Sequence, residues 1–444
     1  MRKLPEKIPK SIDQSLLPSI VTKYYENEEF RNLVNEYNEK YLYWDELKYR
    51  ISDRNERNNV WVMMKTLRSM RSDLLQYSPI LMRYTQLPEI IQNLHRFDTY
   101  LSGHIQIHNR DLKLDGRFIV NSLIEESISS SLLEGAVTTR REAREMLEKK
   151  KMPRNDGEQM VMNNYETLHL IKKYLNKPLT PDFILEIQRT VTKETIPDED
   201  VGSFRNNNEI KIMDTVYGTI HHIPPDFKNI HSLMDDVCDY VNRTNDSSFI
   251  HPIIKGIVLH FLIGYIHPFN DGNGRTARSL FYWYTLSHGY WFMEYLSISP
   301  EILRTKNQYA LAYLYSEYDD LDLTYFIRYN LECLNLAFQE FIRYAESVQE
   351  LQLNAQMISR SIEGLTQRQA EILTDMNENP NYEYTISQIS EKFVIARESA
   401  RTDLLHLHDM NLISKVRRGK TFYFYVDLEN LKYIDRINSG NPEY

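Results

Sequence analysis

The chain has 444 residues and a formal net charge of −9 at pH 7. This length predicts about two to four domains, and the acidic balance excludes a polycation built to coat DNA or anionic lipid. With only 14 glycines and 16 prolines but 42% hydrophobic residues, the composition favours a helical protein with a sizeable core over a β-sandwich, a β-barrel or a disordered chain.

Cysteine usage and hydropathy point to the cytoplasm. Cys238 and Cys333 lie in segments with helical periodicity and form no CxxC pair, so we expect two buried thiols rather than a disulfide framework. The basic residues at the start of the chain are not followed by the apolar stretch of a signal sequence. The longest apolar run, residues 253–266, is shorter than the roughly 20 residues that a membrane span needs. We therefore expect a cytoplasmic protein without membrane contact.

Residues 1–115 read as a helical N-terminal region. Two segments carry apolar residues at three- and four-residue steps, which is typical of amphipathic helices with aromatic faces. The first series is Phe30, Leu33, Val34, Tyr37 and Tyr41, and the second is Trp61, Met64, Leu67, Leu74 and Leu75. A further helix is expected to begin at Pro88.

Residues 116–361 have the pattern of a helical bundle. One helix runs from about Phe118 to Leu132 and ends at Gly135, where a C-terminal glycine is favoured. Further helices are expected to begin at Thr138–Thr139 and near Asp156, and to cover residues 225–242, 252–266, 275–287, 300–315 and 323–360. Between them, residues 205–222 alternate between apolar and polar side chains, which predicts a short β-hairpin placed to cover a functional site.

Residues 362–444 change in character. Helices are expected to begin at Thr366, Thr385 and Ala396, and strands to cover residues 413–416 and 421–426. This order of three helices and a hairpin resembles a winged helix-turn-helix. The sequence thus predicts a mainly α protein of three domains, residues 1–115, 116–361 and 362–444.

A loop between two of the expected helices carries the features of an anion site. Two glycines within residues 271–274 allow backbone N–H groups to point outward, and the helix that follows adds its positive end. Arg275 and Arg278 lie in the first turns of that helix, where they can bracket phosphate oxygens. Gly272, Asn273, Gly274, Arg275 and Arg278 are therefore candidate phosphate-binding residues.

The same segment offers a base and a metal ligand. Asp271 is a hard oxygen ligand suited to Mg²⁺, and His267 has an intrinsic pKa suited to accepting a hydroxyl proton. The alternative is a plain helix–loop–helix connector with a capped helix. That alternative does not account for a base, a metal ligand, an anion loop and two arginines within residues 267–278.

Residues 267–278 resemble the HxFx(D/E)GNGRxxR signature of the Fic family at every specified position. The resemblance extends from residue 116 to about residue 335 and implies a Fic-type helical bundle. It also implies transfer of AMP from ATP to a Ser, Thr or Tyr hydroxyl of a target protein, with Mg²⁺ as cofactor. His267 would be the catalytic base and Asp271 the metal ligand. Gly274 stands where phosphorylating Doc-like members carry lysine, which favours nucleotidyl transfer.

Two further segments resemble parts of regulated Fic proteins. Residues 202–205 and 223–225 are similar to the sequences that flank the family's hairpin flap, so the resemblance implies that a target docks near residues 206–222. Residues 130–135 are similar to the inhibitory motif (S/T)xxxE(G/N), with Ser130 and Glu134 on one helix face. The resemblance implies autoinhibition by Glu134, and leaves open that this carboxylate also supports removal of AMP.

A rival interpretation makes the chain a winged-helix DNA-binding regulator with a Fic core of secondary importance. Residues 365–427 contain eight Lys/Arg and nine Asp/Glu, so we expect weak or no DNA binding there. A patch of Arg397, Arg401, Arg417, Arg418 and Lys420 leaves weak binding open, alongside contact with a protein or assembly into a homodimer. We expect His221, His222, His251 and His260 to be structural, and Asn307, Gln308 and Tyr309 leave the adenine wall unassigned.

Overall fold

The computed structural model of the chain is mainly helical, as the composition predicts. It describes residues 4–9, 14–75, 77, 80–101, 106–107, 110–111, 116–213, 218, 220–243, 249–380, 382–427 and 430. Its named strands form small two-stranded antiparallel sheets. Within the described ranges, no helix combines the length and apolar character needed to cross a membrane.

The chain folds into two compact units that interleave along the sequence. The first comprises residues 1–103, 126–137 and 155–337, and the second comprises residues 104–125, 138–154 and 338–444. Helices α6 (Gly116–Leu133) and α15 (Thr324–Ser361) each run from one unit into the other. The three domains expected from the sequence stay a prediction.

The N-terminal helices of the first unit pack around aromatic side chains. Phe30, Val34, Tyr37, Trp44 and Trp61 are buried together, so the apolar periodicity correctly predicts the inner faces. Asn27 and Asp53 cap two of the helices by accepting hydrogen bonds from backbone N–H groups. The helices are α1 (Leu17–Glu26), α2 (Glu28–Glu39), α3 (Trp44–Leu47), α4 (Arg54–Arg71) and α5 (Pro88–Leu101), with the 3₁₀ turn η1 (Gln14–Leu16) before them.

One expectation in this region is wrong. Leu74 and Leu75 do not continue the helix of Trp61 but lie in strand β1 (Ser72–Leu75), which pairs with β2 (Met82–Thr85). Ser72 is extended, and its hydroxyl donates to the Arg68 carbonyl at 2.6 Å, which ends α4. Leu67 and Leu74 are seven residues apart, and this spacing also fits a helix. The apolar pattern alone therefore did not reveal that the helix ends between them. Strands β3 (Gln106–Ile107) and β4 (Arg110–Asp111) form another short pair.

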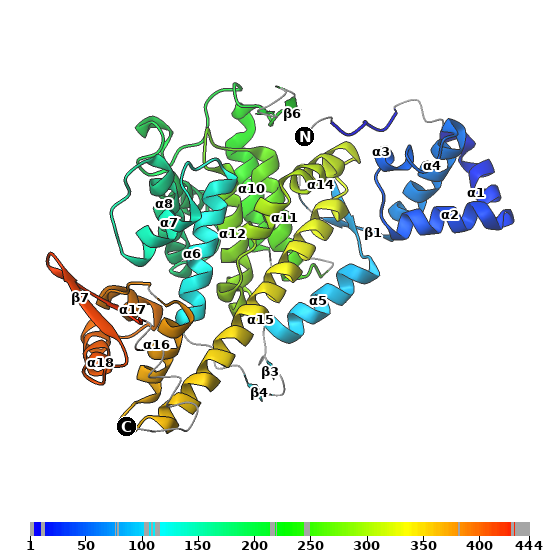
Figure 1. The fold of residues 1–444 in the computed structure, drawn as a ribbon. Coiled ribbons are helices and arrows are strands. Elements are labelled where there is room, and N and C mark those ends of the chain that lie inside the picture. The colour runs from blue at the N-terminus through cyan, green and yellow to red at the C-terminus, as the bar shows by residue number, and fades with distance from the viewer. Residues whose placement is uncertain are drawn as a thin grey trace. The chain divides into compact units, whose positions relative to one another are not determined.

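The rest of the first unit is a bundle around α11 (Pro252–Ile266), whose residues are almost all buried. Such a helix, apolar on every side, needs neighbours all round, and α12 (Asn273–Ser287) packs along it (Figure 1). The helix expected over residues 300–315 is interrupted at Thr305. The other elements are α8 (Asp156–Lys172), α9 (Pro181–Thr192), α10 (Ile230–Asn242), α13 (Ser299–Arg304), α14 (Lys306–Tyr318), η2 (Asp198–Asp200), η3 (Phe227–Asn229) and η4 (Trp291–Tyr295).

The predicted hairpin is present but shorter than residues 205–222. Strand β5 (Ile212–Met213) pairs with β6 (Ile220–His222), with Ile212 opposite His222. Residues 214–217 and 219, which belong to the expected hairpin, lie outside the described residues.

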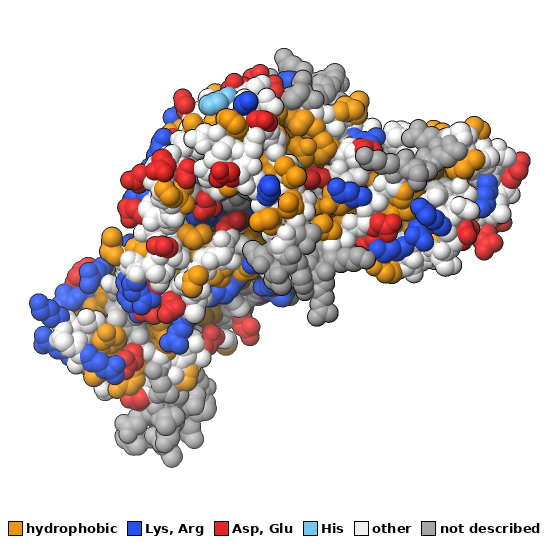
Figure 2. Space-filling model, turned by 90° about the horizontal axis from the view of Figure 1, so that it is seen from above, with side chains coloured by type: hydrophobic (Ala, Val, Ile, Leu, Met, Phe, Trp, Pro, Cys, Tyr) orange, Lys and Arg blue, Asp and Glu red, His pale blue; other side chains and the backbone are white. Residues whose placement is uncertain are grey.

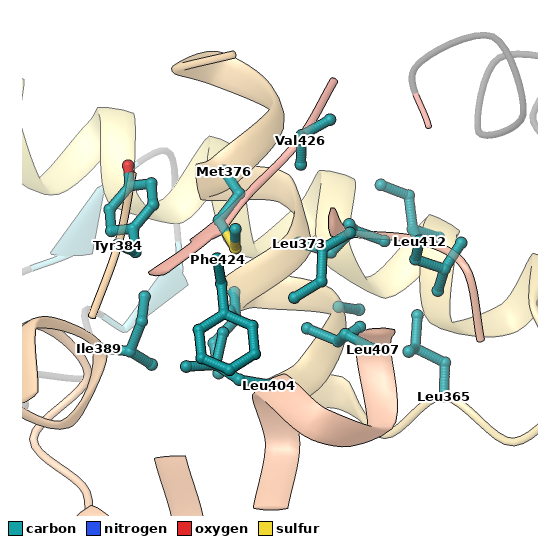
Figure 3. Packing of buried hydrophobic residues seen from close by; sticks show 14 of the residues in the cluster. Leu365, Leu373, Met376, Tyr384, Ile389, Leu404, Leu407, Leu412, Phe424 and Val426 are labelled. Carbon is teal, nitrogen blue, oxygen red and sulfur yellow. The ribbon is translucent and has the colours of Figure 1, made fainter. Parts of the chain in front are cut away.

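The second unit contains the C-terminal helices and hairpin in the order expected from the sequence. Thr366 and Thr385 begin two of the helices with capping boxes, and Figure 3 shows Leu373, Leu404 and Phe424 in the shared core. The elements are α7 (Arg140–Glu148), α16 (Gln367–Glu378), α17 (Ile386–Lys392), α18 (Arg397–Asp409), β7 (Ser414–Arg418) and β8 (Thr421–Tyr425).

Candidate active site

A short loop joins the buried helix α11 to α12 in the first unit. Helix α11 ends at Ile266, and His267 adopts a left-handed conformation with φ 49° and ψ 60°. Gly272, with φ 86°, precedes the first residue of α12. A Cβ at Gly272 would also lie 2.7 Å from Thr192 Cγ2, so glycine is required there both for backbone conformation and for space.

Asn273 fastens this loop with its side chain. Its Oδ1 accepts a hydrogen bond from the Phe269 N–H at 3.0 Å, and its Nδ2 donates to the Phe269 carbonyl at 2.9 Å. The amide side chain is therefore occupied within the loop. Any contact of Asn273 with an anion would involve its backbone N–H at the N-terminus of α12.

His267 is held as a neutral base. Its Nδ1 lies 3.2 Å from the Gly264 carbonyl oxygen, which can only accept, so Nδ1 carries the proton and Nε2 keeps a free lone pair. Burial lowers the pKa of His267 to about 4, although the Gly264 hydrogen bond and Glu134 act in the opposite direction. An imidazole in this state can accept a proton at neutral pH.

Two buried arginines lie beside the loop. Arg275 donates from Nη1 to the Val191 carbonyl at 2.6 Å, and Arg278 donates from Nε to Ser130 Oγ at 2.9 Å. Among the described residues, the buried Nε of Arg275 and Nη1 of Arg278 have no hydrogen-bond partner. Buried donors are normally satisfied, and so two open donors next to a helix N-terminus fit a site for phosphate oxygens.

The carboxylate of Glu134 occupies part of this site. Its Oε1 accepts a hydrogen bond from Arg278 Nη2 at 2.8 Å and lies 2.0 Å from the position that a Cβ on Gly274 would take. Partial burial alone would raise the pKa of Glu134, but the neighbouring charged groups, Arg278 first and Arg275 after it, together outweigh this effect and lower the pKa. The charged carboxylate therefore rests on the loop only because residue 274 is glycine.

The last turns of α6, directly before Glu134, are anchored to the neighbouring helices. Arg278 also donates from Nη2 to the Ser130 carbonyl at 3.1 Å. Two turns earlier, the buried Glu126 carboxylate accepts from the Tyr282 hydroxyl and from the Ser299 N–H, each at 3.0 Å. Burial raises the pKa of Glu126. These contacts fix the segment against α12 and the start of α13.

Asp271 is the candidate metal ligand. Its Oδ1 accepts from the Gly272 N–H at 2.5 Å, and its Oδ2 is 3.5 Å from Arg275 Nη2. About half of the side chain is exposed (52%), so its oxygens have room for a cation. In the part of the chain that the structure describes, no group of three or more potential ligands gathers. A single carboxylate fits Mg²⁺, which commonly keeps waters and substrate phosphates as its other ligands.

Arg205, just before the hairpin, links three segments of the site. It donates from Nε to the His267 carbonyl at 2.9 Å, from Nη1 to the Asn207 carbonyl at 2.8 Å, and from Nη2 to the Pro225 carbonyl at 2.5 Å. Its own N–H donates to the Pro268 carbonyl at 2.9 Å. The sequence analysis located Arg205 at the edge of the flap but did not predict these contacts, because no local sequence pattern indicates which carbonyl groups a distant arginine will bind.

Three of the four histidines that were expected to be structural have partners within the first unit. His222 lies between Glu317 and the Tyr265 carbonyl, His251 contacts Asp98, and His260 contacts the Tyr309 hydroxyl. These contacts tie strands and helices of the first unit to one another, as the sequence interpretation expected.

Comparison with known proteins connects the loop to a family. The model of the Fic/DOC family matches residues 178–285, which include the loop and both arginines. A curated relative from Nematostella vectensis, named protein adenylyltransferase Fic, is 27% identical over 51% of this chain and 50% of its own length. A protein of the same name from Drosophila willistoni is 29% identical over 45% of this chain and 38% of its own. The chain thus spans half or less of these relatives.

Solved structures agree at the level of the fold. A Fic family protein from Desulfovibrio desulfuricans superposes with a TM-score of 0.51 and 18% identity, covering 77% of this chain and 97% of that one. Fic-1 from C. elegans gives the same TM-score and identity, covering 77% of this chain and 90% of that one.

Proposed function

We propose that the protein is an adenylyltransferase that moves AMP from ATP to a Ser, Thr or Tyr hydroxyl of a target protein, because the Fic/DOC family model matches residues 178–285. One observation carries the proposal. A neutral His267, whose Nε2 is free, lies at the start of an anion loop that is flanked by two arginine donors without a hydrogen-bond partner among the described residues. The names of the curated relatives support the same reaction.

In the proposed reaction, the phosphates of ATP lie on the N–H groups at the start of α12 and against Arg275 and Arg278. The target hydroxyl attacks the α-phosphorus while Nε2 of His267 takes its proton. The bond between the α-phosphorus and the bridging oxygen breaks, and pyrophosphate leaves. Asp271 would hold Mg²⁺, which neutralises charge on the leaving phosphates when bound.

ATP labelled at different phosphates tests the reaction class. With the Glu134→Gly variant and a cell extract as the source of targets, label from the α-phosphate should enter protein and label from the γ-phosphate should not. Transfer of the γ-label would show phosphorylation instead. Absence of both would refute a protein-modifying reaction with ATP as donor.

The hairpin is the proposed docking site for the target. Met213, Ile220 and Ile223 keep 51%, 40% and 67% of their surface exposed, which is unusual for large apolar side chains on so short a segment. An extended target segment could add to the hairpin edge through backbone hydrogen bonds while its side chains cover these residues. That geometry would bring a target hydroxyl towards His267.

Asp271→Ala should raise the Mg²⁺ concentration needed for half-maximal AMP transfer by roughly tenfold, since a charge-assisted contact is worth about 1.5–3 kcal/mol and each ~1.4 kcal/mol is tenfold. The measurement is a Mg²⁺ titration of initial rates in the Glu134→Gly background. Asp239→Ala, which removes an exposed carboxylate of α10, is the matched control. An unchanged midpoint in Asp271→Ala would refute the assignment.

Arg205→Ala should lower the rate of AMP transfer by about 10²-fold, because a misplacement of ~1 Å at the reacting centre has that effect. Arg205 is a positioning residue, so ATP binding should stay near the wild-type level while the rate for the target falls. Arg205→Lys keeps one donor and should recover part of the rate. The control is Arg304→Ala, at an exposed arginine. A parallel loss of ATP affinity would show general damage to the fold instead.

A further inference from the structure

In the C-terminal module, residues 366–427, one side of α18 packs against the core of the module and the other side is exposed. Ala400, Leu404 and Leu407 of this helix are buried in the core of the module, whereas Arg397, Arg401 and Thr402 are exposed. Helix α17 precedes α18 across the turn at residues 393–396 and packs against it. In a helix-turn-helix this second helix is the one that enters the major groove of DNA.

Ion pairing separates the basic residues of the module into two groups. Four of them contact carboxylates, in the pairs Arg368–Asp403, Lys392–Asp375, Arg401–Glu398 and Arg418–Glu383. The other four, Arg397, Lys415, Arg417 and Lys420, form no ion pair with a carboxylate among the described residues. The near-neutral sum of charges also conceals their uneven placement, because the hairpin, residues 414–425, carries Lys415, Arg417, Arg418 and Lys420 and contains no Asp or Glu.

The unpaired cations lie on α18 and on the hairpin. Arg397 begins α18, Lys415 and Arg417 alternate along β7, and Lys420 lies at the turn to β8. Lys415 and Arg417 flank the ring of Phe422, at 5.7 and 5.6 Å from its centroid. Figure 2 shows several Lys and Arg side chains in the region of β7. Two carboxylates pair with the other arginines of these elements, Glu398 with Arg401 and Glu383 with Arg418.

We propose that this surface binds double-stranded DNA, with α18 in the major groove and the hairpin along the phosphates. Four unpaired cations can displace about four condensed counterions, which predicts a slope of about −3 to −4 for log affinity against log salt. Arg401 adds a fifth contact when it leaves the exposed Glu398. The paired Arg418, which the sequence had grouped with this patch, contributes less. The proposal does not depend on the AMP-transfer activity.

The test measures the anisotropy of a labelled duplex of roughly 30 base pairs, about three helical turns, with the full chain from about 50 to 200 mM salt. Arg397→Ala and Lys420→Ala should each reduce the slope by about one. Arg343→Ala removes the same charge at an exposed site of α15 and should leave the slope unchanged. Thermal unfolding should show that all three variants fold alike.

Three results would overturn the proposal. These are no binding by the wild type at the lowest salt, a slope smaller than one, and equal losses in Arg343→Ala and Arg397→Ala. Any of them would favour contact with a protein instead. AMP transfer by Arg397→Ala and Lys420→Ala should equal that of the wild type, which separates a failure of this proposal from a failure of the proposed enzyme.

Discussion

His267→Ala should reduce AMP transfer by about 10²–10⁴-fold, the usual contribution of a positioned general base. ATP binding should persist, because the loop amides and both arginines stay in place. The comparison is best made in the Glu134→Gly background, where the rate is expected to be high enough to follow the loss. His95→Ala, at an exposed histidine of α5, is the control. A rate within a few-fold of the parent would exclude His267 as the base.

The same residue predicts an unusual pH dependence. The base must be unprotonated to act, and burial lowers the pKa of His267 to about 4. The rate at limiting substrate should therefore stay level from neutral pH down to about pH 5 and fall only below that. An ordinary histidine would lose activity already near pH 6.5. A fall centred near 6.5 in the pH profile would contradict the neutral state of this partly buried ring.

The sequence predicted the parts of the site that are local in the chain. The loop at residues 267–278 combines the end of an apolar helix, two glycines and the start of another helix, and each of these has its own sequence signal. The structure brings Ser130 and Glu134 to Arg278, as the resemblance to the inhibitory motif implied. Their roles in binding and catalysis stay predictions.

The parts that escaped prediction depend on partners far apart in the chain. Glu126 reads as one more polar residue of α6, yet it is buried because Tyr282 and Ser299 supply its hydrogen bonds. Arg205 likewise obtains its role from carbonyl groups at His267 and Pro225. A periodicity or a motif cannot show such contacts, since nothing in the local sequence records which distant backbone groups lack a donor.

The contacts of Glu134 carry the prediction about regulation. Its carboxylate accepts from Arg278 and covers the backbone at Gly274, where the terminal phosphate of ATP would otherwise lie. ATP bound beside this carboxylate would be displaced, and a displacement of ~1 Å lowers the rate by about 10²-fold. The wild-type protein should therefore be nearly inactive as isolated, although its base, loop and arginines are in place.

Glu134→Gly should raise AMP transfer, including self-modification, by roughly tenfold or more, a conservative share of that displacement effect. It removes the carboxylate from Arg278 Nη2, which keeps only its contact with the Ser130 carbonyl, so ATP should also raise the melting temperature more in the variant than in the wild type. Glu148→Gly removes a comparable helix-end carboxylate paired with Arg144 and should change neither quantity. If Glu134 also supports removal of AMP, the variant should lose that activity as transfer rises. Equal transfer rates in the wild type and in Glu134→Gly, at saturating ATP and Mg²⁺, would show that Glu134 is an ordinary carboxylate at a helix end without an inhibitory role.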